Sequence, residues 1–205
     1  MGFDKEELKE YNFLSPQNGF NVSKKYILDL VSREIIDKSK NNRLPYDIDS
    51  KILVYEDRQK TWFFDVAESL KSNNEAGFVI LMISIAYLES SQKYIEGKKG
   101  KSGEYIRKAL ARVFGSSLGK DEEKMFVDGV RNGLFHDGIT KKGIFLNASQ
   151  NNIFERYGES MVVNPHEFFK IAKTEFLGYI KNLKSPANQE LRNKFEQMWD
   201  LQKGI

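Results

Sequence analysis

Hydrophobic residues recur at the three- and four-residue spacing of an α-helix over most of the segment 57–138. This pattern predicts four helices, with approximate ranges 57–70, 74–96, 104–114 and 121–138. The second of them is hydrophobic on nearly every face between Phe78 and Leu88. A helix without a polar face has to be covered by neighbours on most sides, so we expect it to be central. Asn74 and Asp121 are the expected N-caps of the second and fourth helices.

The first forty-five residues predict a separate helical segment. Asn21 is an expected N-cap, and the hydrophobic residues that follow it at helical spacing are Tyr26, Ile27, Leu30, Val31 and Ile35. The polar run 38–42 and Leu44-Pro45 should end this helix. We therefore expect an N-terminal helical appendage over residues 1–45 and a main domain over residues 46–205.

The hydrophobic spacing changes to two between residues 144 and 163, which predicts short strands. We expect a small β-hairpin or a three-stranded antiparallel β-meander at about 143–164. Asn164-Pro165 combines a capping residue with a proline at the first helical position, so a helix should begin there and run to about Leu183. A short amphipathic helix should follow it. The expected fold class is mainly α: a four-helix bundle with a β-meander insert and additional N- and C-terminal helices.

The composition excludes several kinds of catalytic and metal site but does not identify a function. The 205 residues include no cysteine and only two histidines, which excludes disulfides, cysteine nucleophiles and a three-histidine zinc site. We expect no metal and no cofactor. The 32 basic and 29 acidic residues give a net charge of +3, too small to predict nucleic-acid binding by itself. The longest apolar run has about twelve residues, shorter than a membrane span, and the start resembles no leader, so we expect a cytoplasmic protein that does not enter a membrane.

The segment 128–138 holds the most informative side chains. Arg131 offers a planar fork of donors suited to phosphate, and His136 can exchange a proton near neutral pH. Together they suffice, in principle, for phosphodiester chemistry without a metal. In an ideal α-helix, however, Arg131 lies about 140° round from His136. Either a distortion near Gly133 or the pooling of two copies would let both reach one ligand. The alternative is that Arg131 caps a neighbouring helix or pairs with a carboxylate, and that His136 only caps the C-terminus of its helix.

The run Arg131-Asn132-Gly133-Leu134-Phe135-His136 resembles the Arg-(x)4–6-His motif of the HEPN superfamily, which carries a polar residue after the arginine. The resemblance covers residues 57–138. It implies a metal-independent endoribonuclease that acts as a homodimer with a composite cleft, on RNA, with an antitoxin-like protein as a further partner. In this reading His136 moves protons, Arg131 clamps the phosphate and Asn132 positions it. The alternative is a non-catalytic HEPN-like module that binds nucleotide, nucleic acid or a partner protein.

Two further features leave alternatives open. Glu89 follows the apolar run and could reach an arginine on the core side, which the resemblance supports because helical positions that face the motif often carry an acidic partner. Alternatively, it could be a solvated residue at the polar end of its helix. Gly129 and Gly133, four residues apart, indicate a close helix approach, either inside the monomer or at a dimer axis.

The segment 93–112 is strongly basic and is a candidate nucleic-acid-binding surface. Its expected phosphate contacts are Lys98, Lys99, Lys101, Arg107 and Lys108. Tyr94 and Tyr105, which lie among them, could stack bases. The alternative is an ordinary solvated face.

Overall fold

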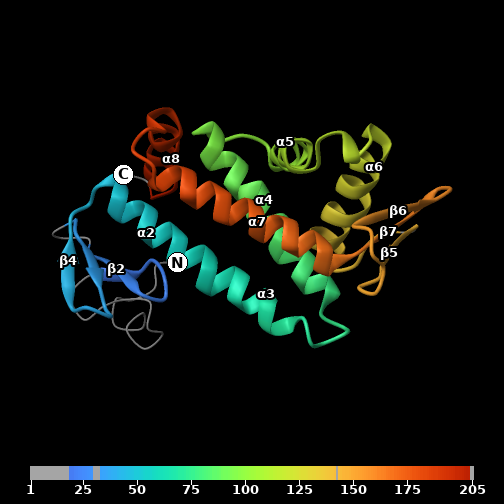
Figure 1. The fold of residues 1–205 in the computed structure, drawn as a ribbon, viewed down its shortest axis with the longest axis horizontal. Coiled ribbons are helices and arrows are strands. Elements are labelled where there is room, and N and C mark those ends of the chain that lie inside the picture. The colour runs from blue at the N-terminus through green and yellow to red at the C-terminus, as the bar shows by residue number, and fades with distance from the viewer. Residues whose placement is uncertain (1–18, 30–32, 142, 204–205) are drawn as a thin grey trace, which may run out of the picture. The chain divides into compact units, whose positions relative to one another are not determined.

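The computed structural model describes residues 19–29, 33–141 and 143–203 (Figure 1). The chain divides into two compact units, residues 1–65 and 66–205. The division falls at Asp65, inside a helical stretch, and not at the expected boundary near Pro45. The chain is mostly helical with two small sheets. In the described ranges, no helix is long and apolar enough to cross a membrane.

The first unit contains strands where we expected a helix, so that prediction is wrong. The strands are β1 (Gly19–Asn21), β2 (Tyr26–Asp29), β3 (Ile35–Asp37) and β4 (Asn42–Leu44), in an antiparallel sheet of that order. Tyr26 and Leu28 are buried, whereas Ile27 between them is only partly buried, so the spacing that matters here is two. Leu30 and Val31, two residues of the expected helical stripe, lie outside the described residues.

In the polar run 38–42, expected to end a helix, residues 38–41 form the tight turn between β3 and β4, and Asn42 begins β4. The carboxylate of Asp37 accepts hydrogen bonds from the backbone N–H groups of Ser39 and Lys40 at 2.9 and 3.3 Å. Asn41 takes a left-handed backbone conformation with φ of 51°, which asparagine tolerates better than most residues. Side-chain hydrogen bonds to the local backbone favour such a turn over a helix.

The helical stretch of the first unit begins earlier than predicted. It consists of α2 (Ile48–Gln59) and the π-helical turn η1 (Lys60–Phe64), and α3 (Asp65–Leu70) is the next element of the chain. Asp47 caps α2 by accepting a hydrogen bond from the backbone N–H of Ser50. Asp57, the expected first residue, lies inside α2, where its carboxylate accepts hydrogen bonds from Ser23 Oγ at 2.7 Å and from the Lys25 N–H at 2.9 Å. These bonds attach the β1–β2 turn to α2.

The second unit is built around α4 (Gly77–Glu96). The helix packs against α5 (Ser102–Phe114), α7 (Pro165–Lys184) and α8 (Gln189–Lys203), and Figure 1 shows α4 and α7 side by side. The expectation of a central helix is therefore confirmed. Its N-cap is Ala76 and not Asn74, and Gly97, with φ of 67°, ends it where the sequence predicted. Asn164 and Pro165 begin α7 as expected.

The predicted fourth helix exists, but much of it is not α-helical. After the short turn η2 (Gly115–Ser117), α6 (Lys120–Met125) is followed by two π-helical segments, η3 (Phe126–Arg131) and η4 (Gly133–Asp137). The N–H of Asn132 reaches the carbonyl of Val127, five residues back, as a π-helix requires. Asp121 is not the N-cap, which is Gly119; it lies in the first turn, where its charge suits the helix dipole.

The two glycines of this helix are explained by close packing inside the chain. A Cβ atom at Gly129 would lie 2.6 Å from Ile144 Cγ1, and one at Gly133 would lie 2.5 Å from the backbone carbonyl oxygen of Ile139. The N–H of Lys141 also donates to the carbonyl of Gly129 at 2.9 Å. Of the two reasons considered for the glycine pair, packing within the monomer is the one that these contacts support.

Three strands follow: β5 (Ile144–Leu146), β6 (Phe154–Tyr157) and β7 (Ser160–Val163). Their positions agree with the prediction, but the sheet is not an antiparallel meander. Its order is β5-β7-β6, with β5 parallel to β7. Asn164 provides the reason, because its side-chain amide donates to the carbonyls of Ala148 and Gln150 at 3.3 and 2.5 Å and holds the loop after β5 back against the start of α7.

Aromatic rings join this sheet to the helices. Phe154 of β6 makes edge-on contacts with Phe114 of α5 and Phe126 of η3, and Phe126 stacks on Phe168 of α7 with ring centroids 5.2 Å apart. Phe126 and Phe168 are fully buried. This aromatic cluster fixes η3, and with it the start of the Arg131 segment, against α5 and α7.

Candidate functional site

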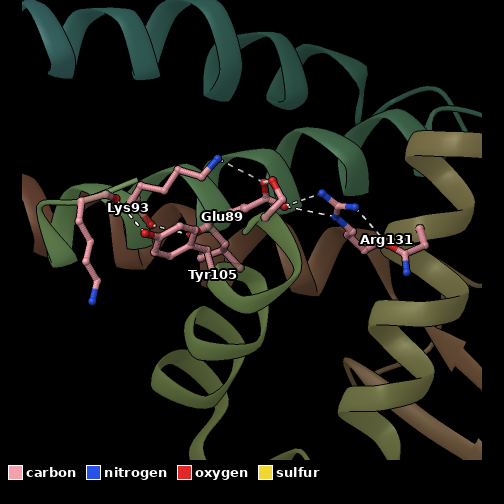
Figure 2. Close-up of polar contacts among 9 residues, drawn as sticks. Glu89, Lys93, Tyr105 and Arg131 are labelled. Atoms are coloured by element: carbon pink, nitrogen blue, oxygen red, sulfur yellow. Dashed lines mark hydrogen bonds and ion pairs between the residues drawn. The ribbon is translucent and has the colours of Figure 1, made fainter. Parts of the chain in front are cut away.

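Arg131 forms an ion pair with Glu89, which projects from the opposing helix α4 (Figure 2). The guanidinium donates through Nε at 3.2 Å and through Nη2 at 3.0 Å, both to Oε2 of Glu89. The two side chains are only 14% and 12% exposed, so water screens the pair less than it would a surface pair. Of the two alternatives for Glu89, contact with Arg131 is the one that the structure has.

Glu89 is shared by other donors on its second oxygen. Oε1 accepts a hydrogen bond from Ser102 Oγ at the start of α5. The same oxygen forms an ion pair with Lys93 Nζ at 3.4 Å. Lys93 could have been found in the sequence, because it lies four residues after Glu89 on the same helix. Ser102 could not, because its contact with Glu89 depends on how α5 packs against α4.

The guanidinium of Arg131 has two more neighbours. Its Nη1 donates to Oδ1 of Asn132 at 3.0 Å, so the side chain expected to position a phosphate positions the arginine in this structure. The guanidinium also lies over the ring of Phe135, 5.4 Å from its centroid. Three of the five guanidinium N–H groups are used by Glu89 and Asn132, which leaves one N–H on each terminal nitrogen to bind a phosphate oxygen.

His136 lies in η4 and is exposed. Within the described residues, its imidazole has no hydrogen-bond or ion-pair partner, so it is available to a ligand. In an ideal α-helix, Arg131 and His136 would point in directions about 140° apart. A π-helix reduces this angle, because positions five apart lie closer to one face than in an α-helix. A π-helical distortion is present at Gly133, and no hydrogen bond joins Arg131 to His136.

The basic segment is partly neutralised. Lys108 and Lys98 both pair with Glu96, at 2.9 and 3.7 Å, and Arg107 pairs with Glu123 at 3.0 Å. Burial acts to raise the pKa of Glu96, but hydrogen bonds from Lys108 and Gln92 outweigh it and lower that pKa below its ordinary value. Glu96 therefore stays ionised and offsets the two lysines.

Two basic residues of that segment remain unpaired. Lys99 and Lys101 are exposed, and neither forms an ion pair with any other residue that the structure describes. The expected stacking role of the tyrosines is wrong, because Tyr94 and Tyr105 are 1% and 2% exposed. Tyr94 stacks on Phe195 of α8, and the Tyr105 hydroxyl donates to the carbonyl of Lys98 at 2.8 Å. Both tyrosines therefore have a structural role and are not accessible to bases.

Comparison of the chain with protein-family models, with curated proteins and with solved structures finds no match. Among the described residues, no group of three or more histidine, aspartate or glutamate side chains is placed to hold a metal ion.

Removal of the carboxylate from the Glu89–Arg131 pair should lower the stability of the protein. Glu89→Gln keeps the size of the side chain but leaves the largely buried guanidinium without its carboxylate, so the free energy of unfolding should fall by about 1–3 kcal/mol. Urea titration of wild type and variant measures it. The control Glu159→Gln removes an exposed carboxylate without a described partner and should change stability by less than about 0.5 kcal/mol. Equal stabilities of Glu89→Gln and wild type would contradict this role of the pair.

Proposed function

We propose that the protein is a metal-independent endoribonuclease of HEPN type, with the motif of Arg131 and His136 as its active site. The observation that carries the proposal is the state of the motif helix. It is π-helical at the motif, its arginine is held by Glu89 and Asn132, and its histidine is exposed. Side chains five residues apart can approach one ligand on such a helix more readily than on an α-helix.

The chemistry follows from the two side chains. The 2′-hydroxyl of a ribose attacks the adjacent phosphorus, the bond to the 5′-oxygen breaks, and the products are a 2′,3′-cyclic phosphate and a 5′-hydroxyl. His136 transfers the proton, and Arg131 stabilises the negative charge that grows on the phosphoryl oxygens through its two remaining N–H groups. Glu89 fixes the direction of the guanidinium. In a homodimer, the two motifs would form one composite cleft.

The test is cleavage without metal. The purified protein is incubated with single-stranded RNA in excess EDTA, and the ends of the products are identified by mass spectrometry. We expect cleavage that EDTA does not reduce, with cyclic phosphate at the 3′ ends. RNA that stays intact over a range of sequences, with or without Mg²⁺, would contradict the enzyme proposal.

A second candidate is a non-catalytic HEPN-like module that binds nucleotide, nucleic acid or a partner protein. The observation that favours it is the engagement of Arg131, since two of its five N–H groups bond to Glu89 of α4 and a third bonds to Asn132 beside it. An arginine held in this way can serve the fold alone. Binding of RNA without cleavage would favour this candidate.

The lysines of the loop between α4 and α5 predict salt-dependent binding. If Lys98, Lys99 and Lys101 contact phosphates of single-stranded RNA, replacing all three by alanine should flatten the log–log dependence of affinity on salt by up to about 2 units. Most of the change should come from Lys99 and Lys101, because Lys98 pairs with Glu96. Fluorescence anisotropy at several salt concentrations measures the slope. A slope equal to that of wild type would return these lysines to an ordinary solvated face.

A further inference from the structure

An open hollow of about 430 Å³ lies between the helix α6–η3 and the sheet β5–β7. This volume falls in the range of small-molecule sites, about 300–1,000 Å³. The hollow shares no lining residue with the motif: Arg131 contacts α4, whereas the hollow is bounded by the neighbouring part of the helix and by the strands. It is therefore a second candidate site, independent of the proposed ribonuclease.

The hollow has an apolar part. Met125 of α6 and Ile144 of β5 line it, together with Gly129, whose missing side chain lets Ile144 pack directly against the helix backbone. Ile144 is 7% exposed and Met125 is partly buried. These two side chains can cover an apolar face of a small ligand.

The charged residues around it are not all engaged with one another. Arg156 of β6 donates to Glu122 at 3.0 Å and lies 3.8 Å from Asp121, so its charge is already compensated. This hydrogen bond lowers the pKa of Glu122 below its ordinary value. Lys124 and Lys141, in contrast, are exposed and form no ion pair within the described ranges.

Lys124 forms no ion pair in the described structure, although two aspartates lie at helical spacings that would allow one. It lies three residues after Asp121 and four residues before Asp128, and both spacings allow an ion pair on a helix. Neither carboxylate is within 4.0 Å of its ammonium group in the described structure, and Asp128 is instead 3.7 Å from Arg107. Lys124 and Lys141 thus each present an ammonium group at the hollow that is not held in an ion pair by the carboxylates that also line it.

We propose that this hollow binds a phosphate monoester with a hydroxyl-bearing organic part, such as a sugar phosphate or a nucleoside monophosphate. Two ammonium groups match the charge of a phosphate monoester, about −1.5 to −2 at neutral pH, better than that of a single carboxylate. Met125 and Ile144 cover the organic part. Glu159, a further lining residue without a described partner, can accept hydrogen bonds from its hydroxyl groups.

The test uses the full-length protein and the methyl NMR signals of Met125 and Ile144. Glucose 6-phosphate and uridine monophosphate are titrated separately, alongside glucose, uridine and inorganic phosphate. At least one monoester should shift both methyl signals and bind at least about 10-fold more tightly than its dephosphorylated form and than inorganic phosphate. The monoester that binds identifies whether the organic part is a sugar or a nucleoside.

Variants assign the binding to the two lysines. Lys124→Ala and Lys141→Ala should each weaken it by about 5- to 10-fold, since each removes one charge-assisted contact. Lys120→Ala, an exposed lysine of α6 that does not line the hollow, should leave it unchanged. If neither monoester shifts the methyl signals at millimolar concentration, the proposal is wrong. It is also wrong if inorganic phosphate binds as tightly as both, or if the variant lacking both lysines binds like wild type.

Discussion

His136→Ala should lower the rate of RNA cleavage by about 10²–10⁴-fold while leaving RNA affinity unchanged, because it removes proton transfer and no phosphate contact. Stability should change by less than about 0.5 kcal/mol, since the imidazole is exposed and has no partner in the described part of the chain. Single-turnover kinetics in EDTA, RNA binding by anisotropy and urea titration measure the three quantities. A loss of cleavage that comes with a loss of stability would indicate that His136 serves the fold.

Arg131→Ala is the companion variant, and its expected profile differs. It should abolish cleavage, weaken RNA binding and destabilise the protein, because the same guanidinium holds Glu89. Mixing this variant with His136→Ala tests the composite site. Light scattering must first give about twice 23.8 kDa, and the subunits must exchange. Partial recovery of RNA cleavage in the mixture would then show that one intact arginine and one intact histidine suffice for cleavage. A monomer would exclude the composite site.

The helices of the second unit could be predicted from the sequence because their signals are local. Apolar residues at helical spacing, Gly97 as a terminator and the Asn164-Pro165 start each depend on a few neighbouring residues. The N-terminal strands could not be predicted in the same way. Tyr26 and Ile35 are compatible with a helical stripe as well as with strands, and the turn that the Asp37 side chain closes after β3 depends on hydrogen bonds that hydrophobic spacing does not reveal.

In the candidate site, too, the features with local sequence signals could be predicted, and those that depend on the fold could not. The motif of Arg131 and His136 can be found in the sequence, and the contact with Glu89 was one of two open alternatives. The π-helical segments could not be found, because the spacing of hydrophobic residues does not show where the chain that follows packs against this helix. The N–H of Lys141 bonds to the carbonyl of Gly129, and residues 139–141 occupy the space beside Gly133. The hollow cannot be predicted for a related reason, since its lining comes from segments that only the fold brings together.

The close contact at Gly133 leads to the second large effect. Gly133→Ala would place a Cβ atom 2.5 Å from the carbonyl oxygen of Ile139 and 3.0 Å from the backbone nitrogen of Lys141. Backbone atoms cannot move aside as the end of a side chain can, so the cost of overpacking should exceed the gain in helix propensity, which is about 1 kcal/mol. We expect a net loss of about 2 kcal/mol and a melting temperature about 4–8 °C lower.

Gly178→Ala is the matched control, because it makes the same change in a helix where nothing lies within 4 Å of the new Cβ atom. It should stabilise the protein by about 0.5–1 kcal/mol, since alanine favours a helix and restricts the unfolded chain. Calorimetry should therefore give shifts of opposite sign for the two variants. Gly129→Ala should fall between them, because its contact is the side chain of Ile144, which can move. A Gly133→Ala protein as stable as wild type would show that residues 139–141 do not pack closely against the motif helix.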